Sequence, residues 1–187
     1  MDSYNYNLLY IKMSKIVFNE TDYKSPDGMM TSVWGPPLWH SIHTISFNYP
    51  VKPSKEDKAN YYTFYYNLKN VLPCRYCREN LAKNFKKLKF GKSVFKSRDT
   101  LSRWLYNLHE EVNRMLDKTS NLSYEQVRDR YEHFRSRCLS SNEISKTKET
   151  GCTKSLYGVK GKCILAIVPK NSTLKSFNMD PKCKIKK

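Results

Sequence analysis

The sequence has few glycines, few acidic residues compared with basic ones, and no long hydrophobic run. Six glycines in 187 residues are too few for a β-sandwich built on glycine turns. Aromatic residues are abundant, with fourteen tyrosines and eight phenylalanines, which argues against a disordered chain. No apolar run approaches the roughly 18 residues of a membrane helix. We therefore expect a protein without a membrane span that is not secreted.

The positive charge of the chain, +17 in total, is concentrated in two segments. Residues 83–98 contain seven basic side chains and no acidic one, and residues 139–187 contain eleven lysines and three acidic side chains. Such segments are compatible with nucleic acid or acidic protein surfaces as partners. A solvated face and a basic tail account for the same composition, so we do not expect nucleic-acid binding.

Helical periodicity dominates from residue 35 to about 138, where apolar residues recur at three- and four-residue steps. Capping patterns precede two of the predicted helices, SKED at 54–57 and SYEQ at 123–126. The predicted helices run from 35 to near 50, from 55 to 71, from within 74–77 to 91, from 99 to 118, and from 124 to 134. We expect the second to bury Tyr61, Phe64, Tyr65, Leu68 and Val71, and the fourth to bury Leu101, Trp104, Leu105, Leu108, Val112 and Met115.

These segments predict an all-α fold, a four-helix bundle with a short fifth helix and an irregular basic C-terminal tail. The predicted divisions are an N-terminal extension over 1–30 with one short helical segment, the bundle over 31–138, and the tail over 139–187. The tail contains a single strand-like run, CILAIVP at 163–169.

The sequence LPCRYCREN at 72–80 places Cys74 and Cys77 two residues apart. A structural zinc site needs four ligands, usually as two close pairs, and no second pair is present. His40 and His43 lie on an aromatic-rich helical face, where core packing or cofactor contact is the more common role. We therefore predict no metal site.

Disulfide exchange in a helical setting suits the cysteine pair better than a thioredoxin-like site or a structural disulfide. A thioredoxin-like site requires a preceding strand, but a tyrosine-rich helix precedes this pair. A disulfide that spans two residues restricts the unfolded chain very little, so it stabilises poorly. At a helix N-terminus, beside Arg75 and Arg78, the thiolate is favoured and disulfide exchange is promoted. Such a pair still needs an electron acceptor.

Three blocks of sequence lie in order on consecutive predicted helices: WGPPLWHSIHTISFNYP at 34–50, YNLKNVLPCRYCRENL at 66–81 and WLYNLHEEVNRML at 104–116. This combination resembles the Erv/ALR family of FAD-linked sulfhydryl oxidases, most closely its large-DNA-virus branch. The resemblance covers about residues 34–136. It implies a bundle wrapped around the isoalloxazine of FAD, with the cysteine pair as the redox centre.

The resemblance also implies which residues contact FAD. The first helix would line the flavin pocket, the fourth would hold the ring system and adenosine, and Lys118 and Tyr131 would lie near the phosphates or ribose and the adenine. For Trp104 and Val112 taken singly, core packing is the favoured interpretation. The full set is Gly35, Trp39, His43, Trp104, His109, Val112, Asn113, Lys118 and Tyr131.

In the implied cycle, Cys74 exchanges with a substrate dithiol and Cys77, against the flavin, passes the electrons to FAD. O₂ then reoxidises the flavin and gives hydrogen peroxide. The resemblance further implies a homodimer that acts on protein dithiols in the cytoplasm of an infected cell or in the virion. Two alternatives stay open: a basic CxxC module that binds zinc or nucleic acid without catalysis, and a flavin-binding scaffold without turnover.

The sequence departs from the family at several positions. Cellular members usually place a disulfide-forming cysteine pair where this chain has Tyr106 and Ser123. This chain therefore lacks that disulfide. Glu110 stands where asparagine is usual, and Thr119 where proline is common.

The tail raises a separate question about disulfides. Four cysteines in and just before the tail allow three pairings, with structural or electron-shuttling roles. We favour a structural Cys138–Cys152 bond and leave Cys163 and Cys183 unassigned.

Overall fold

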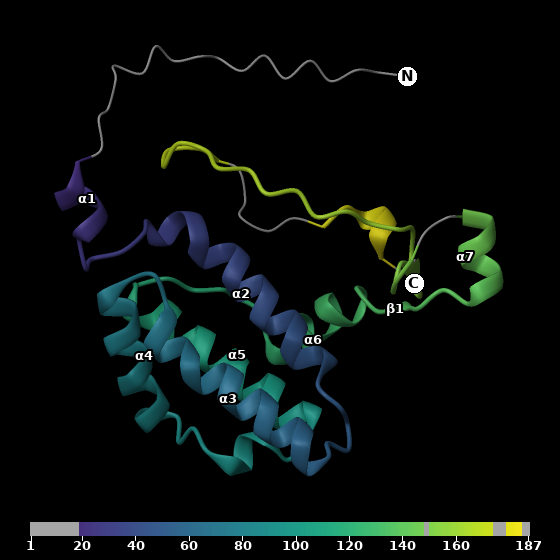
Figure 1. The fold of residues 1–187 in the computed structure, drawn as a ribbon, viewed down its shortest axis with the longest axis horizontal. Helices are drawn as coiled ribbons and strands as arrows, with labels where there is room; N and C mark the ends of the chain where they lie inside the picture. Colours follow the sequence, from purple (N-terminus) through teal and green to yellow (C-terminus); the bar gives the residue numbers. More distant parts are fainter. Residues whose placement is uncertain (1–18, 148–149, 174–178, 185–187) are drawn as a thin grey trace.

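The computed structural model describes residues 19–147, 150–173 and 179–184, which form a mostly helical protein (Figure 1). The prediction of an all-α fold is confirmed: α2 to α5 are the four bundle helices and α6 is the short fifth. In chain order the elements are α1 (Glu20–Lys24), α2 (Thr31–Asn48), α3 (Lys55–Val71), α4 (Arg75–Lys87), the 3₁₀ helix η1 (Lys92–Phe95), α5 (Arg98–Met115), α6 (Tyr124–Glu132), β1 (Ser136–Arg137), α7 (Ser141–Thr147), β2 (Lys154–Ser155) and the 3₁₀ helix η2 (Pro181–Cys183).

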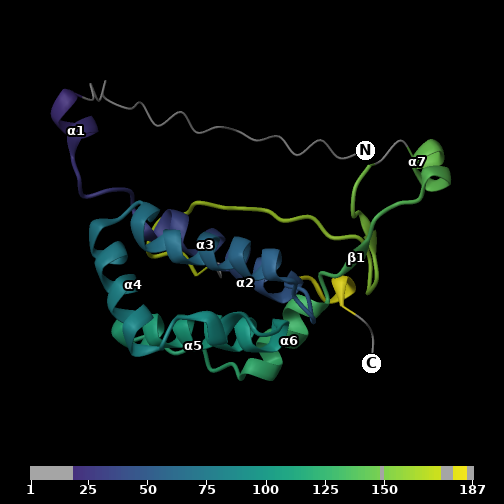
Figure 2. The ribbon, with the colours of Figure 1, turned by 60° about the horizontal axis from the view of Figure 1, so that its bottom comes forward.

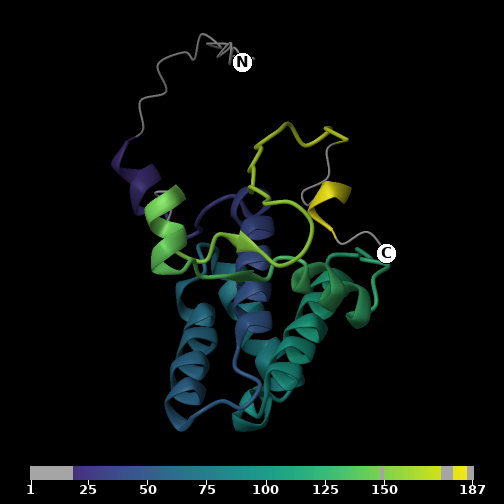
Figure 3. The ribbon, with the colours of Figure 1, turned by 90° about the vertical axis from the view of Figure 1, so that its right-hand side faces the viewer.

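The helices pack in a simple pattern. α2 packs on α5, α3 packs on α4, and α6 contacts both α2 and α5. Figure 2 shows α2 and α3 in one layer above α5, with α4 at one end. The N-terminal ends of α2 and α4 lie at the same end of the bundle (Figure 1). The tail lies on one side of this assembly (Figure 3).

Local sequence sets where several helices begin. The Ser54 hydroxyl accepts a hydrogen bond from the Asp57 backbone N–H at 3.0 Å, and the Asp57 carboxylate accepts one from the Ser54 N–H at 2.8 Å. The same reciprocal box joins Ser123 and Gln126 at the start of α6, and a box opened by Ser97 begins α5. Each such cap contributes about 1 kcal/mol. The two boxes predicted from the sequence are present.

The core lies between α2, α3, α4, η1 and α5. Two buried tyrosines cross it and satisfy their hydroxyls on backbone carbonyls: Tyr65 donates to Ile42 O at 2.8 Å and Tyr49 to Phe95 O at 2.9 Å. These bonds let polar rings fill an apolar core without leaving an unpaired hydroxyl. The apolar core residues are Ile42, Tyr49, Tyr65, Leu81, Phe85, Val94, Phe95, Leu101, Trp104, Leu105 and Leu108.

The predicted start of the first bundle helix is wrong. We expected the helix to begin at the prolines, but α2 begins at Thr31 and contains Pro36 and Pro37. A proline inside a helix removes one backbone hydrogen bond. Both prolines lie in the second turn, where each removes the N–H that would donate to the carbonyl four residues before it. The earlier residues Val33 and Trp34 donate to Met30 O and complete the first turn.

The fourth bundle helix ends earlier than predicted. α5 stops at Met115 rather than at Lys118. Asp117 has a left-handed backbone (φ 51°), and the Lys118 N–H donates back to Asn113 O at 2.9 Å. This is a Schellman ending, which satisfies carbonyls that would otherwise be unpaired. It normally uses glycine at the left-handed position, so the sequence carried little signal for it.

The predicted buried face of α3 is partly wrong, because Phe64 and Val71 are exposed. Tyr62 packs against the core instead. Tyr61, Tyr65 and Leu68 contact the core as predicted. Tyr62 also lies against Phe95 of η1, a helix that the sequence did not predict, with ring centroids 5.7 Å apart. Met115 of α5 is also exposed rather than buried.

The predicted strand in the tail is also wrong. Residues 163–169 form no strand, and Ile164 and Ile167 are exposed. The two short strands lie elsewhere, with Ser136 of β1 opposite Ser155 of β2 in an antiparallel pair. An isolated apolar run cannot form a sheet because its backbone needs a second strand to bond with. The short helical segment expected within 1–30 is present as α1, and residues 1–18 lie outside the described residues.

Within the residues that the structure describes, no helix combines the length and apolar character that a bilayer crossing requires.

Candidate active site

The cysteine pair lies at the N-terminus of α4. Cys74 is the N-cap residue and forms a disulfide with Cys77. The Cys77 backbone N–H donates to Cys74 Sγ at 3.1 Å. Both residues are half-buried. An N–H aimed at a sulfur on the positive end of a helix stabilises a thiolate there, so the environment of Cys74 favours its thiolate form once the pair is reduced.

The two arginines beside the pair are held differently. Arg78 donates from its guanidinium to Leu72 O at 2.6 Å, so its charge lies over the turn that precedes the helix. Arg75 is 3.7 Å from a carboxylate oxygen of Asp27, which offsets part of its charge. Arg78 therefore supplies the less compensated positive potential near the sulfurs.

A second group of side chains, which we call the imidazole cluster, joins α2, α5 and α6 and consists of Trp39, His43, His109 and Tyr131. The rings of Trp39 and His109 stack with centroids 3.9 Å apart and planes 2° apart. His43 Nε2 lies 3.1 Å from His109 Nδ1, within hydrogen-bond distance. Tyr131 stacks on His43 with centroids 5.3 Å apart. Four of the predicted site residues, from three helices, thus lie together.

Burial keeps both histidines of the cluster neutral. Desolvation, with smaller contributions from His109 and His40, lowers the pKa of His43 to about 3. Desolvation lowers the pKa of His109 to about 4. One neutral imidazole therefore donates to the other. His43 is 3% exposed, and its buried Nδ1 has no hydrogen-bond partner among the residues that the structure describes. Such an atom is costly unless a further group bonds to it.

The remaining predicted residues are not part of the imidazole cluster. A Cβ built at Gly35 would meet no described atom within 4 Å. The Asn113 amide donates to Glu110 Oε1 at 3.1 Å, so the acid that replaces the usual asparagine holds the Asn113 side chain. Val112 is half-buried and Lys118 is exposed.

Trp104 lies in a different environment. Its ring packs against Phe85 and Phe90, with centroids 5.6 Å and 5.0 Å away, and its indole N–H donates to Leu88 O at 3.0 Å. These are contacts of the bundle core. They agree with core packing for this residue, and its contact with a flavin stays a prediction.

Several residues of this region were not predicted from the sequence. Phe47 stacks on Tyr131 at 5.2 Å and His40 stacks on it at 5.6 Å. Both lie about one turn from His43 along α2, and that spacing is the signal that could have found them. A further omission is the segment around Gly28, whose backbone contacts Cys74. The sequence PDG at 26–28 is a turn signal that marks it.

In the tail, Cys138 and Cys152 form a disulfide, and Cys163 and Cys183 are free thiols. The bond has the pairing that we favoured, and its structural role stays a prediction. Cys183 Sγ lies 3.4 Å from the position of a Cβ built on Gly161, so η2 packs on the segment that precedes Cys163.

The part of the chain that the structure describes holds no group of three His, Cys, Asp or Glu side chains arranged for a metal ion. A shallow cavity of about 220 Å³ lies between the C-terminal end of α2, the start of α5 and α6. None of the predicted site residues lines it.

Comparison with known proteins identifies the family. A sequence model of the Erv1/Alr family matches residues 36–132, which include the cysteine pair and the imidazole cluster. The chain belongs to the Erv1/Alr family. Within this family, it is 38% identical over 85 residues to a probable FAD-linked sulfhydryl oxidase of Acanthamoeba polyphaga mimivirus, covering 46% of this chain and 59% of the relative.

Other Erv1/Alr relatives come from cells and viruses. The mitochondrial FAD-linked sulfhydryl oxidase of Saccharomyces cerevisiae is 26% identical over 106 residues, covering 56% of this chain and 54% of the relative. An FAD-linked sulfhydryl oxidase of African swine fever virus is 25% identical over 123 residues, covering 66% of this chain and 98% of the relative. The chain spans about half the length of the first two relatives.

The fold of the family is also found in solved structures. The yeast Erv1 core superposes with a TM-score of 0.50 at 23% identity, covering 64% of this chain and 97% of the core. The FAD-binding domain of yeast Erv1 gives a TM-score of 0.51 at 23% identity, covering 56% of this chain and 95% of that domain. At this identity the likeness concerns the fold alone.

Proposed function

We propose that this chain is an FAD-dependent thiol oxidase that forms disulfide bonds in protein substrates. The observation that carries the proposal is the Cys74–Cys77 disulfide at the start of α4, with the Cys77 N–H on Cys74 Sγ. The naming of its relatives as FAD-linked sulfhydryl oxidases supports it. The oxidase domain spans 31–138, between the N-terminal extension 1–30 and the tail 139–187.

Two observations fit FAD beside the imidazole cluster. The buried Nδ1 of His43 has no partner in the described part of the chain, and the edge of an isoalloxazine offers both donors and acceptors. The face of α2 at Gly35 is open, so a flat ring could approach the backbone there. The residues that would hold FAD are Gly35, Trp39, His43, Trp104, His109, Val112, Asn113, Lys118 and Tyr131. When bound, FAD supplies a two-electron acceptor that O₂ reoxidises with release of hydrogen peroxide.

The protein supplies the exchange chemistry. A substrate thiolate attacks Cys74 Sγ, the Cys74–Cys77 bond breaks, and Cys77 leaves as a thiolate. The second substrate thiol then attacks the sulfur of its own chain in the mixed disulfide, and Cys74 leaves as a thiolate. The substrate loses two electrons and the cysteine pair gains them. The Cys77 N–H and the α4 dipole stabilise the Cys74 thiolate, and Cys77 would be the sulfur placed against FAD, the electron acceptor.

The assembly and location follow as further parts of the proposal. We expect a homodimer, and the exposed Phe64 and Tyr66 on α3 offer an apolar face for it. Sedimentation equilibrium would report its mass. The mimivirus and African swine fever virus relatives support a site of action in the cytoplasm of an infected cell or in the virion. Immunolocalisation during infection would test that placement.

The deciding experiment is the visible absorption spectrum of the purified protein, recorded before and after dithiothreitol is added without oxygen. We expect a flavin band that bleaches with thiol and recovers on aeration, together with hydrogen peroxide. A folded, colourless protein would overturn the proposal, and a zinc assay would then test the alternative CxxC module. A flavin band that thiol leaves unchanged would indicate a scaffold without turnover.

A further inference from the structure

A short segment before α2 is paired with the backbone on both sides of Cys74. We call residues 27–30 the strap. The Met29 N–H donates to Pro73 O at 2.7 Å, and the Arg75 N–H donates to Asp27 O at 3.2 Å. Between these two bonds Gly28 forms an antiparallel bridge with Cys74. The strap therefore lies directly against the residue that exchanges with substrate.

This pairing requires glycine at position 28. Gly28 has a φ of 105°, which side-chain-bearing residues rarely adopt. A Cβ built there would lie 2.3 Å from Pro73 O and 3.0 Å from Cys74 Cα. The close approach of the two backbones is thus a specific feature of the sequence and not an incidental contact.

The strap is tied to the bundle on both sides. The Trp34 indole N–H of α2 donates to Met29 O at 3.0 Å. On the α4 side, the Asp27 carboxylate lies 3.7 Å from the Arg75 guanidinium. This ion pair offsets the single charge of the strap, while Arg78 keeps its charge over the turn before α4.

The side chains that flank this pairing are apolar and exposed. Met29 and Met30 on the strap are each 70% exposed, Val71 near the end of α3 is 68% exposed, and Tyr76 between the two cysteines is 64% exposed. None of them contributes to the core. Single exposed apolar residues are ordinary, but four that flank one reactive sulfur suggest a contact surface. Methionine side chains adapt to varied partners because they are flexible and polarisable.

We infer that Met29, Met30, Val71 and Tyr76 form a docking surface that selects protein cysteines flanked by apolar side chains. The inference rests on the proposed thiol-oxidase function. Its occupant is a substrate segment, because the strap pairs with the backbone on both sides of Cys74, the sulfur that a substrate thiolate must reach, and Val71 and Tyr76 lie within three residues of it in the chain. The near-neutral strap favours apolar flanks over charged ones. The surface acts before any bond changes, by holding the substrate cysteine beside Cys74 for exchange.

The test uses the full-length protein and two dithiol peptides of the same length and charge, one with leucine and one with serine beside each cysteine. The measured quantity is the ratio of kcat/KM for the leucine peptide to that for the serine peptide. We expect a ratio of about ten in the unmodified protein, and a ratio near one in the double variant Met29→Ser, Met30→Ser. Flavin content and circular dichroism confirm that each variant is folded.

Val51→Ser serves as the matched control, because Val51 is a similarly exposed apolar residue in the loop after α2, at the other end of that helix. Its ratio should equal that of the unmodified protein. A ratio near one in the unmodified protein, or a ratio that the strap variant leaves unchanged, overturns the inference. A ratio changed only by Ile164→Ser with Leu165→Ser also overturns it, since selectivity then resides in the tail. Failure of the unmodified protein to oxidise dithiothreitol would instead overturn the proposed function.

Discussion

The bundle and the tail each contain one disulfide, and they are held together in different ways. The bundle helices have capped ends and a continuous apolar core. The Ser102 hydroxyl of α5 lies 2.8 Å from the Tyr124 hydroxyl of α6, and the Tyr106 hydroxyl of α5 donates to Leu122 O in the loop before α6 at 2.8 Å. The tail has a two-residue strand pair and exposed apolar side chains, with Cys138–Cys152 connecting it to the end of the bundle. We therefore expect the Cys74–Cys77 bond, in the well-packed bundle, to be available for disulfide exchange, and the Cys138–Cys152 bond, where packing is sparse, to be structural.

The largest expected effect separates the roles of the two disulfides. Cys77→Ala should reduce thiol-dependent oxygen consumption to the background of free flavin, because no exchangeable bond remains beside the cofactor. Flavin content should not change. Cys152→Ala is the matched control and should keep most of the activity. Substantial turnover in Cys77→Ala, measured with an oxygen electrode, would contradict the assignment of roles.

The second prediction concerns the stability of the bundle at acidic pH. His43 and His109 have pKa values lowered to about 3 and about 4, so below pH 6.5 the unfolded chain binds protons that the folded bundle does not. The free energy of unfolding should therefore fall as the pH decreases from 6.5 towards 4, by about 1.4 kcal/mol per pH unit for each imidazole. Urea unfolding at pH 7, 5.5 and 4.5 measures the slope, and His43→Gln should reduce it. A flat profile would be inconsistent with buried neutral imidazoles.

The tail should respond to acid in a lower range. It contains no histidine, and hydrogen bonds from Lys154 and Ser140 lower the pKa of Glu143 to about 2. The contribution of Glu143 is present above its ordinary pKa and is lost as the pH falls from about 4.5 to 2. Amide exchange followed along a pH series would show whether the bundle loosens before the tail.

The third prediction concerns the tail disulfide. The double variant Cys138→Ala, Cys152→Ala should cost about 3 kcal/mol of closure free energy for a loop with a sequence separation of 14. The loss should appear as faster amide exchange at Leu156, whose N–H donates to Arg135 O at 3.0 Å. The melting temperature of the bundle should stay the same. A fall in that temperature would mean that the tail is part of the bundle's cooperative unit.

The smallest expected effect concerns the bond that connects α5 with the start of α6. Tyr106 occupies a position where cellular members of the family usually carry a cysteine. Tyr106→Phe should lower the free energy of unfolding by about 1 kcal/mol, since Leu122 O loses its donor. Tyr76→Phe, at an exposed ring, is the control and should have no effect. Equal urea midpoints for both variants would show that this bond contributes nothing.

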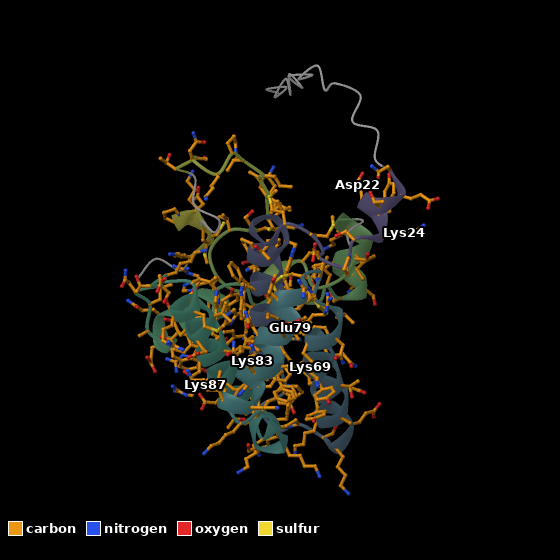
Figure 4. All side chains as sticks on the ribbon, turned by 90° about the vertical axis from the view of Figure 1, so that its left-hand side faces the viewer. Asp22, Lys24, Lys69, Glu79, Lys83 and Lys87 are labelled. Carbon is orange, nitrogen blue, oxygen red and sulfur yellow. A yellow bond between two sulfur atoms is a disulfide. The ribbon has the colours of Figure 1, made fainter. Side chains whose placement is uncertain are left out.

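The basic residues of α4 lie on the bundle and are partly paired there. Lys83 and Lys87 lie one turn apart on the outer side of α4, with Lys69 on the neighbouring α3 (Figure 4). Lys87 is paired with Glu111 at 2.8 Å, so the basic stretch is partly compensated within the bundle. Exposed pairs of this kind contribute little to stability. Recruitment of acidic partners by this stretch is still a hypothesis.

Local sequence patterns were sufficient to predict the bundle helices and the position of the cysteine pair at a helix start. The boxes at Ser54 and Ser123 and the N-terminal position of Cys74 depend on residues within four positions of each other, so the sequence predicted them. The same holds for His43 and Trp39, which share a face because they are one turn apart. The left-handed ending of α5 was missed because Asp117, and not the usual glycine, occupies the left-handed position. The start of α2 was missed because prolines are expected at a helix entrance and not in its second turn.

By itself, the sequence determined the helical bundle and the cysteine pair at a helix start, because periodicity, caps and motif spacing are short-range properties. The candidate residues for FAD came from the resemblance to the Erv/ALR family. Tertiary structure alone decided that His43 meets His109 across α2 and α5 and that Gly28 lies against Cys74. These contacts join residues on different elements, 66 positions apart in the case of His43 and His109, and arise from how the helices pack. Packing depends on the whole set of buried side chains, which no local pattern encodes.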